Sequence, residues 1–217
     1  MFFKKRVKVL EFIVERVKEF LTEGGTFTLE SFFDEYQKIL TFSGIEEEAG
    51  EREEETITLL DRDVFINRFI GTLLWLIKYR TLTSAKNSSR KLAFLDLKFD
   101  IEMPAVIDSC LQHYDTDRIK ESYDSLDIRC KKVFTGELQK SKEPRFLVSP
   151  LWVGDPDPHP FHIAAQIFLE DMGHNAAPGS VETGNGLIDL IERRFMELTQ
   201  PVADAAADVN FVWMSNR

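Results

Sequence analysis

The strongest hydrophobic repeat in the chain lies at its start, between residues 3 and 21. Apolar residues recur there at alternating spacings of four and three: Phe3, Val7, Leu10, Val14, Val17 and Leu21. Charged residues fill most of the remaining positions, which is the pattern of an amphipathic helix. Gly24 and Gly25 follow, and they predict its end because glycine accepts the left-handed cap conformation.

Two further helices are predicted before residue 80. Thr28 is a good N-cap for the first, which would bury Phe32 and Phe33. Asp61 caps the second, whose apolar positions 65, 66, 69, 70, 73, 74 and 77 cover more than one face. We therefore expect this last helix to be central and largely buried. Between the two, the acidic residues 46–55 predict a solvated linker.

The pattern changes to a period of two after residue 80. Residues 81–83 and 92–101 are predicted to be strands around a polar turn at 86–89. In the second strand, Leu95, Leu97, Phe99 and Ile101 alternate with polar residues, as on a half-buried strand. The expected structure is a β-hairpin.

Helix, short extended segment, two helices and hairpin is an order that resembles a winged-helix domain. The segment 20–33, FLTEGGTFTLESFF, is also similar to the start of such domains. The resemblance covers residues 8–101, with the acidic segment as an insertion. We therefore expect a mainly α fold with a small β component (α+β), in which a winged-helix-like domain at 1–101 precedes a mainly helical domain at 102–217.

The second half has a less regular pattern. Its expected elements are helices from Pro104 and from Asp117, a strand at 146–148, a helix at 160–172, and a helix at 187–198 that ends before Pro201. Proline suits the first turn of a helix, and Gly173 suits the end of the helix at 160–172. The apolar residues 211–214 are expected to dock on the core or on a neighbour.

Composition places the chain among soluble globular proteins. Of its 217 residues, 43% are hydrophobic, and the formal net charge is -10, which argues against a whole-surface polyanion binder. Only two cysteines occur, so a reduced, cytoplasmic setting is expected. No apolar run approaches the roughly 20 residues of a membrane-spanning helix, so we expect no membrane partner.

One short segment has the residue types of a metal site. Asp155, Asp157, His159 and His162 fall within eight residues. Two imidazoles and a carboxylate can bind a transition metal with positions left open, so Asp157, His159 and His162 would suit a metal-dependent hydrolase. The same residues also fit the capped N-terminus of a helix behind prolines that hold the approach extended. The capping interpretation is the simpler of the two.

A second candidate is a local basic surface. No Asp or Glu lies between residues 64 and 95, and from residue 78 onward this range contains five cations: Lys78, Arg80, Lys86, Arg90 and Lys91. In a winged-helix domain they would belong to the third helix and the wing, which can contact phosphates of nucleic acid. The alternatives are a solvated hairpin, or a face that docks the acidic linker or another protein.

Apart from the segment 155–162, no sequence pattern indicates a catalytic centre or a cofactor. A Walker-type loop, GxGxxG, GxSxG and HExxH are all absent from the sequence. Most of the net negative charge falls in residues 102–217, and residues 211–214 are apolar. We therefore expect a non-enzymatic interaction or assembly protein, a subunit of a larger complex that binds a protein partner or forms a homo-oligomer. Nucleic-acid binding through 78–91 is the first alternative, and the metal-dependent hydrolase is the second.

Overall fold

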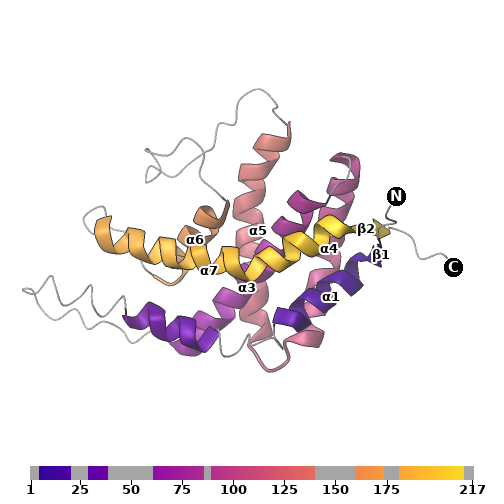
Figure 1. Cartoon of the computed structure of the whole chain (residues 1–217). Coiled ribbons are helices and arrows are strands. Elements are labelled where there is room, and N and C mark those ends of the chain that lie inside the picture. Colours follow the sequence, from indigo (N-terminus) through magenta and orange to yellow (C-terminus); the bar gives the residue numbers. More distant parts are fainter. Residues whose placement is uncertain are drawn as a thin grey trace, which may run out of the picture.

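The computed structural model describes residues 5–20, 29–38, 61–85, 89–139, 160–173 and 181–212. These residues are mostly helical, with a small two-stranded sheet, which confirms the predicted mainly α class (Figure 1). The elements are β1 (Lys5–Lys8), α1 (Val9–Phe20), α3 (Arg62–Ser84), α4 (Ser89–Cys110), α5 (Thr116–Gln139), α6 (Pro160–Asp171), α7 (Val181–Asp208) and β2 (Val209–Val212). A further helix covers residues 29–38.

Helix α3 is the central helix, as its apolar pattern predicts. It packs against α5 and α7, and it also contacts α4 and α6. The Asp61 side chain accepts hydrogen bonds from two N–H groups of the first turn, so the predicted N-cap is confirmed. Phe69 stacks on Phe195 of α7 at 4.9 Å between ring centroids and meets Phe168 of α6 edge-on. These aromatic contacts join α3 to α6 and α7.

Gly71 permits the close approach of α3 and α5. A Cβ atom at this position would lie 2.5 Å from Cβ of Ser122 and 2.6 Å from the carbonyl oxygen of Ile119. Both distances are shorter than atoms in van der Waals contact allow. Only glycine therefore fits here without displacing one of the two helices.

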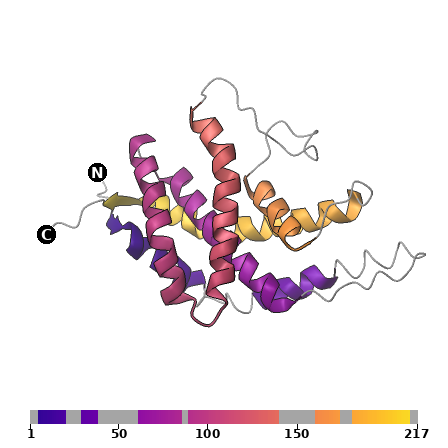
Figure 2. The same cartoon turned by 180° about the vertical axis from the view of Figure 1, so that it is seen from behind.

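The two ends of the described chain meet in the sheet. β1 and β2 pair in parallel, with Lys5 opposite Val209 (Figure 2). The residues of β1 were predicted to be helical, and that prediction is wrong, because their backbone pairs with β2 and the helix begins only at Val9. Phe211 is buried and meets Phe12 edge-on at 5.2 Å, which confirms docking of the C-terminal segment at this residue. Residues 213 and 214 lie outside the described residues.

The prediction of a β-hairpin at 81–101 is wrong. Residues 81–83 belong to α3, and residues 92–101 belong to α4. The buried residues of α4 follow a helical spacing: Leu95, Phe99, Met103, Val106 and Ile107. Since Leu97 and Ile101 are apolar but exposed, they produced the false alternation. A winged-helix module is therefore not confirmed.

Two prolines lie inside helices where a boundary was predicted. Pro104 lies within α4, and Pro201 lies within α7, so neither starts nor ends its helix. Both are exposed, and a helix tolerates the lost backbone hydrogen bond where packing holds it on both sides of the proline. By contrast, α6 begins at Pro160, and Gly173 follows it with a φ of 81°, as predicted.

The hydrophobic core contains residues from both predicted domains. It includes Phe12 and Phe69 of the first and Phe168 and Phe195 of the second, and residue 101 lies inside α4. The linker at 46–55 and the strand at 146–148 lie outside the described residues. The division into domains at 1–101 and 102–217 stays a prediction. Within the described ranges, no helix combines the length and the apolar character needed to cross a membrane.

Candidate functional site

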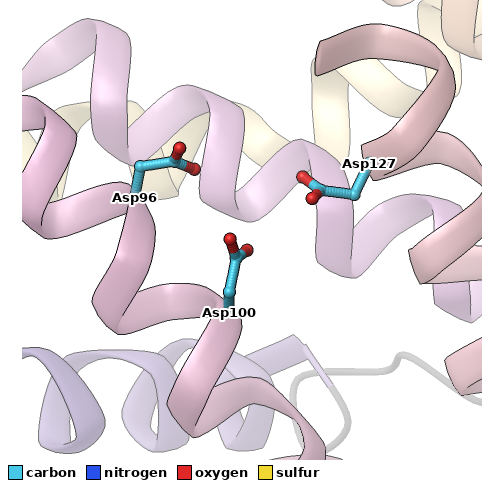
Figure 3. A group of neighbouring side chains, drawn as sticks. All are labelled: Asp96, Asp100 and Asp127. Carbon is cyan, nitrogen blue, oxygen red and sulfur yellow. The ribbon is translucent and has the colours of Figure 1, made fainter.

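A buried lysine lies among three aspartates where α3, α4 and α5 meet. Lys78 of α3 is 2% exposed. Its Nζ lies 2.7 Å from Oδ1 of Asp96, 2.5 Å from Oδ1 of Asp100 and 2.7 Å from Oδ1 of Asp127. Figure 3 shows the three carboxylates pointing toward one another, two from α4 and one from α5. We call these four residues the Lys78 cluster.

The aspartates keep Lys78 charged. Burial alone would lower the pKa of its ammonium group, but hydrogen bonds to Asp100, Asp127 and Asp96 outweigh burial and raise the pKa above its ordinary value. Nearby, burial raises the pKa of the Tyr123 hydroxyl, and the negative aspartates raise it further. One ammonium and three carboxylates give the cluster a formal charge of -2 (+1 - 3).

The geometry of the cluster fits an internal ion network better than a metal centre. The carboxylate oxygens of Asp96, Asp100 and Asp127 lie within 4.8 Å of one another, a separation at which they could hold one cation. The ammonium of Lys78 already donates to these oxygens, and a metal ion would have to displace it. The cluster therefore ties three helices together.

An exposed apolar face runs along α4 beside the cluster. Phe94, Leu97 and Ile101 are 44%, 52% and 60% exposed. Their spacings of three and four place them on one side of the helix. We call these three residues the α4 stripe. Ile128 of α5 is a further exposed apolar residue, 59% exposed, and it directly follows Asp127 of the cluster.

Charged residues border the α4 stripe on both sides. Asp96 and Asp100 each precede a stripe residue, which places them roughly 100° around the helix, toward α5. On the other side, Lys98 and Glu102 form an ion pair at 3.5 Å within α4. The α5 side of the stripe is therefore acidic, whereas the opposite side is balanced.

Two of the five cations predicted to face nucleic acid instead contact other residues of this protein. Lys78 is enclosed in its cluster, and the guanidinium of Arg80 lies over the ring of Phe161, 4.4 Å from the centroid. Lys86 lies outside the described residues, as do the side chains of Arg90 and Lys91. The structure therefore brings no group of these five together as one surface within the described part.

Of the four predicted metal ligands, only His162 lies within the described residues. Asp155, Asp157 and His159 lie outside the described residues. His162 is in the first turn of α6, and its Nδ1 lies 3.2 Å from Oε2 of Glu192 on α7. This contact joins α6 to α7.

Sequence reasoning missed both the Lys78 cluster and the α4 stripe. The spacing of four between Asp96 and Asp100 was available as a sign of one helix face. The strand interpretation instead put these residues on the solvent side of a hairpin. Nothing in the sequence pattern connects them with Asp127, because that contact depends on how α4 and α5 pack.

Comparisons with protein-family models, curated proteins and solved structures found no match to this chain. The candidate function therefore depends on the geometry alone. The candidate functional site has two parts, the Lys78 cluster and the α4 stripe beside it.

Proposed function

We propose that the protein is a non-enzymatic interaction protein that binds a protein partner through the α4 stripe, as a subunit of a larger assembly. One observation carries this proposal: Phe94, Leu97 and Ile101 expose 44–60% of their surface on a single face. Isolated exposed apolar residues are common on soluble proteins. Three within two helical turns form a patch, and patches of this kind mark interaction surfaces.

The arrangement of α4 supports a docking role for the stripe. The opposite face of α4 is fully used in the core, where Leu95, Phe99 and Met103 are all 0% exposed. The buried face fixes α4 on the core, so the helix that carries the stripe would lose little conformational freedom when a partner binds. The neighbouring Lys78 cluster lends rigidity by joining α4 to α3 and α5.

Nucleic-acid binding through residues 78–91 has less support. Lys78 already neutralises carboxylates, and Arg80 packs on Phe161, so two of the five cations are engaged within the protein. The winged-helix geometry that would present the others to phosphate depends on a hairpin, whereas the described residues of this region belong to α3 and α4. A metal-dependent hydrolase has no further support, because Asp157 and His159 lie outside the described residues and His162 alone does not make a metal site.

Site-specific crosslinking tests the proposal. A photoreactive phenylalanine derivative replaces Leu97 in one variant and Met196 in another, because Met196 is an apolar residue of α7 with similar exposure, 41%. In cells that make the protein naturally, we expect a defined crosslinked product from position 97 and none from position 196. The product should disappear when Ile101→Ser is added. Identical products from both positions, or from neither, would contradict the proposal.

A further inference from the structure

The acidic border of the α4 stripe indicates which kind of partner fits it. We propose that the stripe accepts an amphipathic helix of another protein, whose Arg or Lys side chains pair with Asp96 and Asp100. This inference rests on the proposed function, because it names the partner of the same surface.

The shape of the stripe matches a helix. Phe94, Leu97 and Ile101 occupy positions i, i+3 and i+7, and they extend over roughly 10 Å at 1.5 Å per residue. Amphipathic helices are recognised through apolar anchors at this repeat. Two helices that meet along such rows interlock their side chains, so a helical partner buries all three residues at once.

The charge beside the stripe selects a basic partner. The Lys78 cluster has a formal charge of -2, and its cation is enclosed, with 3% of the Lys78 side chain exposed. Asp96 and Asp100 are 34% and 28% exposed, so a cation arriving from solvent reaches the carboxylates without meeting Lys78. An arginine suits this position because its planar guanidinium donates to two carboxylates at once.

The same charges disfavour a second copy of this chain. Two copies would bring Asp96 and Asp100 of each α4 to one interface, in a protein of net charge -10. Like charges placed opposite each other at an interface cost several kcal/mol and exclude such pairings. Lys98 offers little compensation, because it is paired with Glu102 on its own helix. The occupant is therefore a basic helix from a different protein.

Three designed helical peptides test this inference. All carry the same leucine face over about 18 residues, roughly five turns, and they differ only in flanking residues: arginine, serine or glutamate. Binding to the full-length protein is followed by fluorescence anisotropy at about 150 mM salt, where long-range attraction is screened. We expect the arginine peptide to bind at least about fivefold more tightly than the serine peptide, the scale of one charge-assisted contact, and the glutamate peptide to bind weakest.

Matched variants separate the site from general attraction. Asp96→Asn should weaken the arginine peptide about fivefold and leave the serine peptide unchanged, as expected for the loss of one charge-assisted contact. Asp204→Asn removes an equal charge at an exposed position of α7, and it should change neither affinity. Equal losses in both variants, or equal affinities of the arginine and serine peptides, would overturn the inference. If Asp96→Asn fails to fold, Asp100→Asn with the same two peptides decides, and Asp204→Asn is again the control.

A second pair of variants distinguishes failure of the inference from failure of the proposed function. Leu97→Ser combined with Ile101→Ser should abolish binding of every peptide, whereas Met196→Ser should not. If the double variant loses the serine peptide but no peptide prefers arginine, the apolar surface stands and the basic partner is wrong. If the double variant binds all peptides normally, both proposals are wrong. A dimer in sedimentation velocity that Leu97→Ser dissociates would identify a second copy as the occupant.

Discussion

Replacement of Lys78 by methionine tests whether the Lys78 cluster holds the fold together. Methionine keeps most of the length of the side chain and removes its charge. Asp96, Asp100 and Asp127 would then remain with their oxygens within 4.8 Å of one another and no cation between them. We therefore expect a large loss of stability and a changed dependence on pH.

The magnitude follows from the burial of the lysine. Breaking a buried ion pair by removing one partner costs about 3–5 kcal/mol, because the remaining charge loses its compensation. Asp127 is 12% exposed, but Asp96 and Asp100 are 34% and 28% exposed, so solvent screens part of the repulsion. We expect the lower end of the range, about 3 kcal/mol, which is a large share of the 5–15 kcal/mol typical of a folded domain.

The stability of the unchanged protein and that of Lys78→Met depend on pH through different groups: the ammonium in the first and the carboxylates in the second. In the unchanged protein the folded-state pKa of Lys78 lies above 10.5, so its contribution is complete below pH 10.5 and is lost as the pH rises through the folded-state value. In Lys78→Met, three carboxylates remain within 4.8 Å of one another without a cation, so binding a proton relieves their repulsion in the folded state. The folded variant then binds more protons than the unfolded chain, so its stability relative to the unchanged protein improves as the pH falls below 7.

Urea unfolding followed by far-ultraviolet circular dichroism measures these changes at pH 5, 7 and 10. Lys98→Met is the matched control, because Lys98 forms a more exposed pair with Glu102, and its loss should cost less than about 1 kcal/mol. Adding Asp100→Asn and Asp127→Asn to Lys78→Met should restore more than half of the loss, since the repelling charges are removed. The reasoning is refuted if Lys78→Met costs no more than Lys98→Met, or if its deficit grows toward pH 5.

Three further changes test the fold and the free surface, each by urea unfolding at pH 7. Gly71→Ala should destabilise by about 2 kcal/mol, because its Cβ would overlap Ser122 at 2.5 Å, and a neutral result would contradict the close approach of α3 and α5. Asp61→Ala should cost about 1 kcal/mol through loss of the N-cap hydrogen bonds of α3, and Asp61→Asn, which keeps an acceptor, should cost less. Leu97→Ser with Ile101→Ser should change stability by less than about 0.5 kcal/mol; a loss above about 2 kcal/mol would mean that these side chains are packed in the free protein.

Local chemistry in the sequence was sufficient to predict several helix ends and the central helix. Asp61 marks the start of α3 because its carboxylate satisfies N–H groups only a few residues away. Pro160 and Gly173 bracket α6 for similarly local reasons, since each favours a backbone conformation found at a helix end. The apolar residues spread around α3 predicted its burial, because no face was left polar enough for solvent.

Only the tertiary structure decided the state of residues 92–101 and the site formed there. Leu95 and Phe99 face the core, whereas Leu97 and Ile101 face solvent, and the sequence cannot distinguish these two environments for apolar side chains. Together, the buried and the exposed apolar residues therefore gave the period of two that is typical of a strand. Conflict between a local pattern and the fold is expected where a residue serves binding rather than folding.

The Lys78 cluster depended on tertiary structure in the same way. The sequence showed a cation in a segment free of acidic residues, which suggested a basic surface. Packing of α4 and α5 against α3 instead brought Asp96, Asp100 and Asp127 to within hydrogen-bonding distance of Lys78. Asp127 is 49 residues from Lys78 along the chain. The sequence thus determined which residues are charged and where several helices begin, while the packing of three helices decided which charges meet and which apolar face stays in solvent.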